Sequence, residues 1–315
     1  MLNRIFVINN NEELISYIKA KRIKSALIGN GFSLSHPEYG EQFEFKIDKI
    51  LKKLNNLTKD ELNKILKNEY EPKCPETGLK GLRYYYIKCV LEEYIEIFSK
   101  GKNFHGVYSD KNKKKYHCQN FLKKIDAIFT TNYDPLIYFE ILKYNKSKAG
   151  NFIDGFNGID FITQENILKQ LDNKEQKKIY YLHGSWFIQV DYDSKKLRKC
   201  SFSKDSSDTI ESLFNWGNKK LPYLIFEEKS KTKASLIKKS EYFKKCFECL
   251  EKNRNPMLVF GLSFKMDDHI VPKLKGKELY ITYLEDSDKK ALEEKFKKND
   301  IDAEYVKINK NIIWT

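Results

Sequence analysis

Residues 25–33 read SALIGNGFS, an apolar run that ends in two glycines separated by one asparagine. Continuous apolar runs of this length, bounded by turn residues, are typical of a strand that is buried on both faces of a parallel sheet. Glycines directly after such a strand allow backbone N–H groups to approach a phosphate closely. The segment therefore predicts the first strand of a doubly wound α/β sheet, with a ligand-binding loop at its carboxyl end.

Six later segments repeat this pattern of an apolar strand that ends in a polar turn. They are residues 125–130, 178–185, 222–228, 255–264, 277–286 and 303–308. Segments with apolar residues at helical spacing separate several of them, and this alternation is typical of an α/β fold. The sequence therefore predicts a Rossmann-like, mostly parallel sheet with helices on both faces.

A single domain is predicted for residues 1–315, because no low-complexity linker or internal repeat divides the chain. Within it, residues 41–124 are predicted to form a helical insertion after the first strand. Its clearest amphipathic stripe consists of Ile87, Val90, Leu91, Tyr94, Ile95 and Phe98. Pro37, which follows the glycine loop, is predicted to prevent a helix from starting directly after that loop.

The composition is that of a globular protein with a sizeable core. The chain has 315 residues, of which 41% are hydrophobic and 14% aromatic, and this excludes wholesale disorder. No segment approaches the roughly 20 apolar residues of a membrane span, and the N-terminal apolar patch is too short for a signal peptide. We therefore expect a soluble, cytoplasmic protein without a membrane partner.

The net charge of +14 raises the expectation of a nucleic-acid partner. The lysines are spread along the chain, however, and Asn, Ile, Tyr and Phe are abundant too, which fits A+T-rich codon usage. Binding to nucleic acid thus rests on the charge alone, and the salt dependence of DNA or RNA binding would test it.

The cysteines are few and scattered, which favours reduced thiols over a disulfide scaffold. They are Cys74, Cys89, Cys118, Cys200, Cys246 and Cys249. Only the last two form a C-x-x-C pair, and Cys246 shares the apolar face of a predicted helix, which favours a place in the core. Because no four-ligand set has suitable spacing, we expect no metal site and no stoichiometric zinc.

Four polar turns after predicted strands contain residue types suited to binding and catalysis, at residues 29–33, 130–134, 182–185 and 261–263. Ligands of doubly wound sheets bind at the carboxyl ends of strands. In the first turn, Ser33 adds a hydroxyl donor to the glycines. In the second, the Asn132 amide can hold a water or a ribose hydroxyl, because it donates and accepts at once.

His183 and Asp134 each have a structural alternative to a functional role. A histidine with a pKa near 6.5 can take a proton from a sugar hydroxyl at neutral pH, although a lone histidine is more often structural. Asp134 can accept from an amide or hydroxyl, but it can also cap a helix with Pro135 at the first helical position. The glycine loop, in turn, can be a tight turn without a ligand.

The ordered set GNGFS, TTNYD, LHGS and FGLSF resembles the NAD-binding core of the sirtuins, and the match extends from Ser25 to Glu285. The zinc ribbon of protein-deacylating sirtuins is missing, because only Cys200 lies soon after His183 and Cys246 and Cys249 have no partner pair. The element that receives an acyl-lysine peptide is not recognisable either. The helical section after the glycine loop is similar to that of bacterial sirtuin-like proteins of anti-phage defence, which hydrolyse NAD.

This resemblance implies a role for each matching residue. Asn132 would position the attacking water, and His183 would act on a ribose hydroxyl as a base or an orienting partner. Gly29, Gly31 and Ser33 would hold the pyrophosphate and its neighbouring ribose. Asp134 would fix the nicotinamide end, Ser263 the adenosine side, and Glu285 the adenosine ribose. Asn30, Thr131 and Gly261 complete the implied NAD-binding set.

The implied function is a zinc-independent NAD glycohydrolase that yields nicotinamide and ADP-ribose and depletes NAD as an anti-phage effector that aborts infection. NAD is then a substrate, and no cofactor is expected. The alternative is a non-catalytic sensor that binds NAD or an ADP-ribose-type nucleotide and gates a partner. Hydrolysis requires Asn132 and His183 together, whereas binding requires only the glycine loop.

A cell cannot tolerate a constitutive NADase, so the activity must be restrained. We expect control by homo-oligomer formation or by a complex with a separate regulatory or sensor protein. Residues 34–40, which follow the glycine loop, are also predicted to be mobile in the empty protein and to close over the nucleotide.

Overall fold

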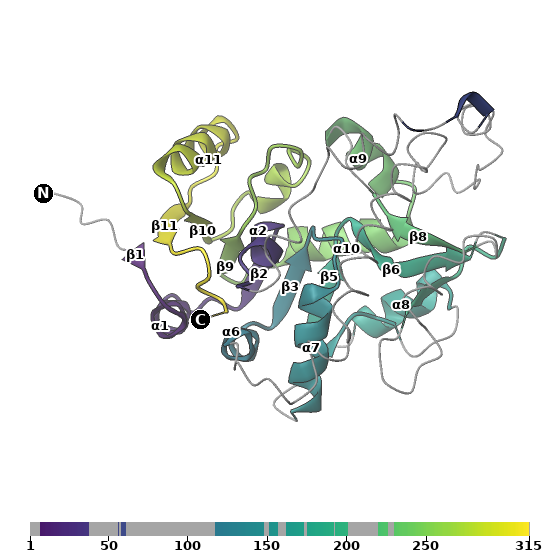
Figure 1. The fold of residues 1–315 in the computed structure, drawn as a ribbon, viewed down its shortest axis with the longest axis horizontal. Coiled ribbons are helices and arrows are strands. Elements are labelled where there is room, and N and C mark those ends of the chain that lie inside the picture. Colours follow the sequence, from purple (N-terminus) through teal and green to yellow (C-terminus); the bar gives the residue numbers. More distant parts are fainter. Residues whose placement is uncertain are drawn as a thin grey trace, which may run out of the picture.

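The computed structural model describes residues 7–37, 56, 58–60, 117–147, 151–156, 162–172, 175–191, 193–200, 220–225 and 230–314. The predicted Rossmann-like α/β fold is confirmed, because these residues form an eight-stranded parallel sheet in the order β1-β11-β10-β9-β2-β3-β5-β4 (Figure 1). Its strands are β1 (Val7–Ile8), β2 (Ser25–Ile28), β3 (Ala127–Thr130), β4 (Phe152–Ile153), β5 (Lys177–Tyr181), β9 (Met257–Phe260), β10 (Leu279–Tyr283) and β11 (Glu304–Ile308).

The strand order reverses at β2, which is the point that matters for function. From β2 the chain proceeds to β3 and β5 on one side, then returns to β9 beside β2 and proceeds to β10 and β11 on the other side. Such a reversal opens a crevice at the carboxyl ends of the two strands that flank it, and ligands of doubly wound folds bind there. The fold therefore directs the search for a site to the ends of β2 and β9.

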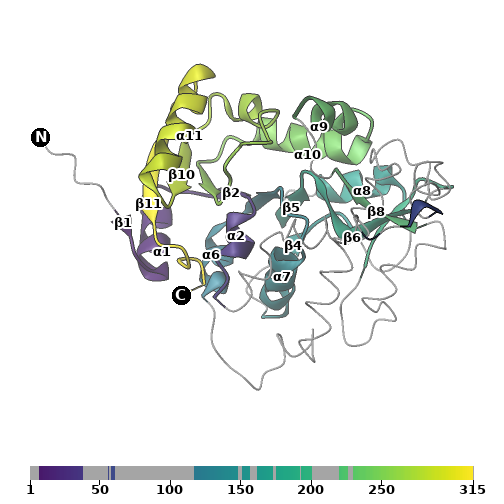
Figure 2. The ribbon, with the colours of Figure 1, turned by 45° about the horizontal axis from the view of Figure 1, so that its top comes forward.

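Helices cover both faces of the sheet (Figures 1 and 2). One layer contains α1 (Asn11–Ala20), α6 (Cys118–Lys124) and α7 (Leu136–Lys146). The other contains α10 (Glu241–Lys252), with α8 (Gln164–Leu171) and the 3-10 helix η4 (Val271–Leu274) packed against it, and α11 (Asp286–Lys298) against β10. Within the described ranges, every helix is too short or too polar to cross a membrane.

The apolar pattern of each element explains its place. All residues of β2 and β9 are buried, as the continuous runs predicted for strands covered on both faces. Helix α10 is capped by Ser240, whose hydroxyl accepts from the Phe243 N–H at 3.1 Å. Cys246 lies on its buried face, which confirms the predicted place in the core, and the described cysteines are all free thiols.

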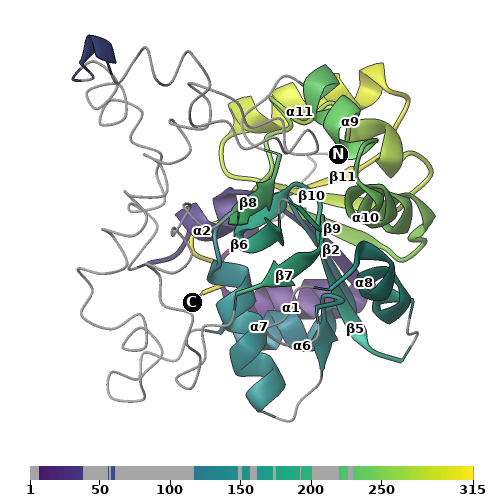
Figure 3. The ribbon, with the colours of Figure 1, turned by 90° about the vertical axis from the view of Figure 1, so that its right-hand side faces the viewer.

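A second sheet was not predicted. Strands β6 (Gly184–Asp191), β7 (Leu197–Lys199) and β8 (Lys220–Leu224) form an antiparallel sheet in the order β7-β6-β8. It lies beyond the β5 side of the main sheet, and Figure 3 views the molecule from that side. The segment around 222–228 was predicted as a strand, but nothing in its composition indicated an antiparallel partner.

Three other expectations are corrected or left open. The strand at Ser25 is not the first, because β1 precedes it and pairs with β11. Pro37 does not delay the helix, because α2 (Gly31–Leu34) starts within the glycine loop and ends before the proline ring can interfere. The predicted insertion at 41–124 lies outside the described residues, apart from 56, 58–60 and the stretch that contains α6.

A buried ion pair joins the small sheet to the main one. Lys199 on β7 pairs with Asp154, which follows β4, and its ammonium lies 4.5 Å from the ring centre of Tyr138 on α7. The side chains of Lys199 and Asp154 are 15% and 8% exposed. Removing one partner of such a pair leaves an uncompensated charge, whereas removing both leaves none.

We therefore expect Lys199→Met to lower the free energy of unfolding by about 3–5 kcal/mol. The double variant Lys199→Met with Asp154→Asn should recover most of that loss, because it removes the stranded carboxylate. Urea denaturation of the wild type, both single variants and the double variant measures the coupling. Additive losses in the double variant would contradict the account.

Candidate functional site

The four turns singled out in the sequence lie at one edge of the sheet. They follow β9, β2, β3 and β5, which are consecutive neighbours and run parallel. The strand ends are level, since Ile28 is in register with both Thr130 and Phe260, and Thr130 with Tyr181. The prediction that Asn132 and His183 follow neighbouring strands is therefore confirmed.

Three predicted residues from two different turns form one buried chain of hydrogen bonds. The Asn132 side-chain amide donates to the Ser33 Oγ at 3.1 Å, and the Ser33 hydroxyl donates to Asp134 Oδ2 at 2.8 Å. The other Asp134 oxygen, Oδ1, accepts from the Leu136 N–H at 3.0 Å. Asp134 therefore supports the start of α7, as the capping alternative predicted, although the helix begins one residue after Pro135. The same carboxylate also fixes Ser33 and, through it, the Asn132 amide.

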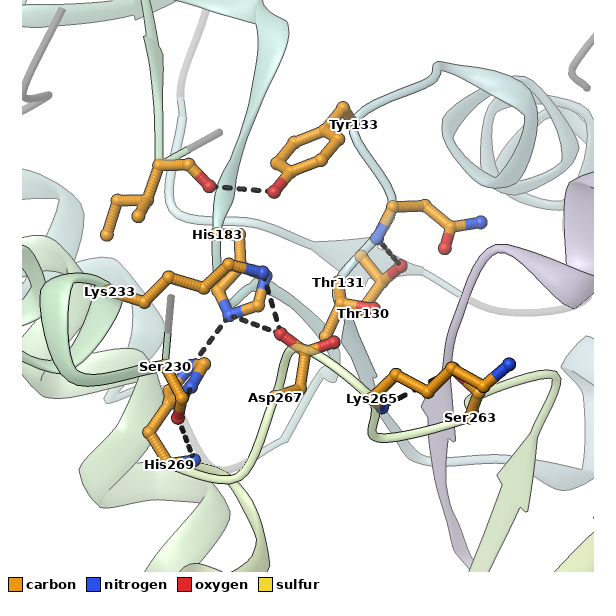
Figure 4. A network of polar contacts seen from close by, with 12 residues as sticks. Thr130, Thr131, Tyr133, His183, Ser230, Lys233, Ser263, Lys265, Asp267 and His269 are labelled. Atoms are coloured by element: carbon orange, nitrogen blue, oxygen red, sulfur yellow. Dashed lines mark hydrogen bonds and ion pairs between the residues drawn. The ribbon is translucent and has the colours of Figure 1, made fainter. Parts of the chain in front are cut away.

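Asn132 has one unpaired atom in this chain. Its Oδ1 is buried and has no hydrogen-bond partner among the described residues, and the residue is 3% exposed. The backbone N–H of Asn132 donates to Thr130 Oγ1 at 3.1 Å (Figure 4), so it is not available as a donor to Oδ1. A buried acceptor without a donor costs about 1–3 kcal/mol. Such an atom fits the binding of a water or a ligand hydroxyl.

Burial also affects the Asp134 carboxyl. Desolvation raises its pKa, and the hydrogen bonds from Leu136 and Ser33 act in the opposite direction.

Thr131 has a more structural role than the resemblance implies. Its N–H donates to the Ile28 carbonyl at 3.0 Å, and its hydroxyl lies 3.5 Å from the same oxygen. It therefore ties the end of β3 to the end of β2.

The glycine loop does not present the free N–H groups that were expected for a phosphate. The N–H of Gly29 donates to Phe260 O, and the N–H of Gly31 donates to Gly261 O, both at 2.9 Å. The N–H of Ser33 is engaged with Asn30 O at 3.0 Å. These glycines instead allow two backbones to approach, because a Cβ on Gly31 would lie 2.5 Å from the Gly261 Cα. The predicted pyrophosphate cradle is corrected to a contact between the β2 and β9 turns.

His183 is fully enclosed, with 1% of its surface exposed. Its Nε2 lies 2.9 Å from the Nε2 of His269 and 3.8 Å from Asp267 Oδ1 (Figure 4). Burial lowers its pKa well below the ordinary 6.5, and the positive charge of Lys233 and the neighbouring His269 lower it further. The imidazole is therefore neutral at pH 7, which is the form that can accept a proton.

Four of the residues around His183 were missed by the sequence analysis. Lys233 Nζ lies 2.8 Å from Asp267 Oδ1, and His269 Nδ1 lies 3.0 Å from the Ser230 Oγ. Burial lowers the pKa of His269 to about 4. The run MDDH at 266–269 was the available signal, since it follows the β9 turn. Ser230 and Lys233 come from α9 (Ser230–Ile237) and had no local signal.

Among the described residues, His183, Asp267 and His269 form the group best placed to hold a metal ion. Their potential ligand atoms all lie within 4.8 Å of one another. The Lys233 ammonium already forms an ion pair with Asp267 Oδ1, however, and the Lys233 side chain is 4% exposed. A divalent cation would have to displace this buried positive charge, so the arrangement favours a neutral histidine pair beside an internal ion pair.

A cavity of about 590 Å³ opens on the other side of the glycine loop, over the ends of β9, β10 and β11. Asn30, Gly31, Gly261 and Ser263 of the predicted set line it, together with Lys265, Thr282, Asp288, Lys295 and Lys310, which were not predicted. Lys295 is engaged with the Phe264 carbonyl and with Asp268, whereas the ammonium groups of Lys265 and Lys310 have no partner among the described residues. The cavity therefore carries positive charge suited to an anionic ligand.

Glu285, which was also predicted, lies outside this arrangement. It precedes α11 as its N-cap residue, it is exposed, and it does not line the cavity. Asp288, three residues later, does line it and accepts from the Glu285 N–H at 3.4 Å. Asp288 is thus the carboxylate that faces the cavity at the end of β10.

The first residues of the predicted closing loop, 34–40, are held in place. Ser35 and His36 are buried, and the Trp314 indole N–H donates to Ser35 Oγ at 3.1 Å and to Phe32 O at 3.2 Å. The ring of His36 packs on Trp314 with centroids 4.5 Å apart. A closing movement therefore does not fit residues 34–37, and residues 38–40 lie outside the described part of the chain.

The buried His183 and the partly buried His269 make stability depend on pH. In the unfolded chain they take up protons below the ordinary pKa of 6.5, whereas in the folded protein their lowered pKa values keep them neutral. Stability is therefore fully present above pH 6.5 and is lost as the pH falls toward 4. We expect the free energy of unfolding to drop by roughly 1 kcal/mol for each imidazole between pH 7.5 and 5.5. Urea denaturation across this window measures it, and a constant or rising value would contradict the assignment.

The sequence model of a protein family described as Domain of unknown function (DUF4917) matches residues 88–285. The match includes the β3, β5 and β9 turns, with Asn132, His183 and Gly261, but begins after the glycine loop at 29–33. No curated protein matches the chain.

Proposed function

This chain belongs to the DUF4917 family, and from its site we propose that it is an NAD glycohydrolase, which cleaves NAD to nicotinamide and ADP-ribose. The observation that carries the proposal is the unpaired Oδ1 of Asn132, which is buried at the carboxyl edge of a doubly wound sheet. A neutral imidazole at the end of the neighbouring strand supports it, because His183 can accept a proton from a sugar hydroxyl.

The cavity supports binding of the adenosine half of a dinucleotide. Its volume of about 590 Å³ falls in the range of small-molecule sites, which are commonly 300–1,000 Å³. Apolar side chains such as Leu262 and Leu292 line it beside the hydroxyls of Ser263 and Thr282. The pyrophosphate would pair with the ammonium groups of Lys265 and Lys310, since the N–H groups of Gly29, Gly31 and Ser33 are occupied.

The 30–33 turn connects the two parts of the proposed site. Asn30 and Gly31 line the cavity, and Ser33 bonds to Asn132. A dinucleotide extended across this turn would bring its nicotinamide ribose to Asn132. The ends of β9 and β10 are separated from the ends of β3 and β5 by β2, so a ligand that reaches both sides must extend across that strand.

The chemistry requires orientation more than it requires a strong catalyst. Nicotinamide leaves as a neutral group, and positive charge develops at the anomeric carbon of the ribose. The unpaired Oδ1 of Asn132 would accept a hydrogen bond from the water that attacks this carbon. His183 would hold, or take the proton of, a ribose hydroxyl, and that interaction strengthens as the charge develops.

The experiment that tests the proposal is incubation of purified protein with NAD, followed by chromatography for nicotinamide and ADP-ribose. Equal amounts of both products are expected from the wild type. A protein that binds NAD with high affinity but returns it intact, with candidate partners supplied, would instead be the sensor of the alternative hypothesis. Restraint by self-assembly or by a partner, and the role in anti-phage defence, remain part of the proposal.

The cavity lysines provide a separate prediction. Lys310→Glu and Lys265→Glu are expected to raise the Kd for NAD by about 10–100-fold, because each removes a charged contact worth about 1.5–3 kcal/mol and adds repulsion. Lys290 on α11 is exposed and does not line the cavity, so Lys290→Glu is the matched control. Isothermal titration with NAD measures the effect, and equal losses in all three variants would point to general charge repulsion instead.

A further inference from the structure

We infer that His269 is a positioning residue for His183, and that the two imidazoles work as one hydrogen-bonded pair. The inference rests on the proposed function in one respect only, namely that His183 serves as the base. The hydrogen bond between the two rings does not depend on the proposed function, because their Nε2 atoms are 2.9 Å apart. Two ring nitrogens at that distance share one proton, so one ring donates and the other accepts.

The surroundings decide which ring donates. The Asp267 Oδ1 lies 3.8 Å from His183 Nε2, and a carboxylate at that side favours an N–H over a lone pair. The proton of the pair therefore belongs to His183 Nε2, which donates to His269 Nε2. His269 then carries its own proton on Nδ1 and donates it to the Ser230 Oγ at 3.0 Å.

His269 is well fixed for this task. The Ser230 Oγ that accepts from its ring also accepts from its backbone N–H at 2.7 Å. The ring packs against Phe247 with centroids 5.7 Å apart, and it is tilted by 35° against His183. A ring held at both nitrogens and at its backbone can hold its partner in one orientation and one tautomer.

This tautomer leaves the reactive nitrogen of His183 free. Its Nδ1 carries a lone pair and has no hydrogen-bond partner among the described residues, whereas its Nε2 is committed to His269. When Nδ1 takes the proton of a ribose hydroxyl, His183 Nε2 passes its own proton to His269 Nε2. His269 becomes the imidazolium, and its Nδ1–H stays hydrogen-bonded to Ser230 Oγ. The pair thereby gains one proton and a charge of +1, which balances the negative charge left on the ribose oxygen.

Burial is the main reason why both rings start out neutral, and the ion pair of Lys233 and Asp267 keeps the surrounding charge balanced. The ammonium neutralises the carboxylate at 2.8 Å, so Asp267 does not draw a second proton onto the histidines. Three charged groups act on the two rings, namely Lys233 from α9 with Asp267 and Asp268, and His269 also acts on His183. The pair is thus a neutral proton acceptor in a charged but balanced surrounding.

The test uses the full chain and two substitutions of His269. His269→Gln keeps an acceptor that can receive the His183 Nε2–H, whereas His269→Leu removes it. Nitrogen-15 NMR of the imidazoles, without NAD, reports the tautomer directly, and the chain has only five histidines to assign. We expect His183 to be the Nε2–H tautomer in the wild type and in His269→Gln, and to become a tautomer mixture in His269→Leu. His117→Gln, at the exposed start of α6, is the control that leaves the His183 signal unchanged.

Turnover supplies the second readout. His269→Leu is expected to lower kcat for nicotinamide release by about 10²-fold with little change in KM, and His269→Gln to retain most of it. A wild-type His183 in the Nδ1–H tautomer, or an unchanged tautomer in His269→Leu, would overturn the inference even if NAD is cleaved. The expected tautomers without any NAD cleavage would uphold the pair and refute the proposed reaction instead.

Discussion

Replacement of His183 by alanine is expected to lower the rate of NAD cleavage by about 10²–10⁴-fold, the usual cost of losing a group that transfers a proton in the transition state. Asn132→Ala should lose about 10²-fold or more, because the attacking water is no longer held beside the anomeric carbon. Binding of NAD should change far less in both variants, since neither residue lines the adenosine-side cavity. Rates of nicotinamide release and titration with NAD separate the two effects.

The stability of Asn132→Ala separates a loss of catalysis from a loss of folding. The substitution removes an unpaired buried acceptor, whose loss is favourable, together with the bond from the Asn132 amide to Ser33, whose loss is unfavourable. Ser33 keeps its bond to Asp134. The free energy of unfolding should therefore change by less than about 1 kcal/mol while activity is lost. Asn166→Ala, on the exposed face of α8, is the matched control that should leave both properties unchanged. Full turnover by Asn132→Ala and by His183→Ala would show that these positions are wrongly assigned.

Gly261→Ala is expected to destabilise the fold strongly. Gly261 has φ +65°, and an added Cβ would lie 2.6 Å from the Gly31 Cα and 2.8 Å from the Phe32 N. These are backbone atoms that cannot rotate away. The left-handed conformation costs about 1–2 kcal/mol and the overlap about 1–3 kcal/mol more. A loss of about 2–5 kcal/mol is therefore expected.

The chain offers a matched control for this substitution. Gly276 has φ +74°, but an added Cβ there would meet nothing within 4 Å. Gly276→Ala should therefore cost only the conformational part, about 1–2 kcal/mol. The difference between the two variants in urea denaturation isolates the contact between the β2 and β9 turns. Equal losses would show that the turns can separate without cost.

The sequence was sufficient to predict the sheet and the edge that carries the site. Buried parallel strands have continuous apolar runs, and β2 and β9 are fully buried as these runs require. Polar turns directly after parallel strands lie at one edge of the sheet, so the sequence could place Asn132 and His183 after neighbouring strands. The bond of 3.1 Å between the Asn132 amide and Ser33 was not predicted.

What could not be predicted depends on contacts between distant parts of the chain. From the sequence alone, the glycines of the 29–33 loop are equally compatible with a bound phosphate and with a closely packed second backbone. The position of Gly261 in the structure shows that they pack against a second backbone. His269 and Lys233 approach His183 because α9 and the segment after β9 fold over it. No local sequence pattern predicts this contact between distant segments. The antiparallel sheet of β6, β7 and β8 was missed for the same reason, since β6 pairs with β8, which lies far from it in the sequence.

The measurement that tests the central claim most directly is product analysis of NAD incubated with the wild-type protein and with Asn132→Ala, side by side, over a range of protein concentrations. Varying the concentration allows for control by self-assembly. The account predicts nicotinamide and ADP-ribose in equal amounts from the wild type, and at least about 10²-fold less of both from the variant. NAD recovered intact from the wild type at every concentration and with candidate partners added, or cleaved equally by the two proteins, would contradict it.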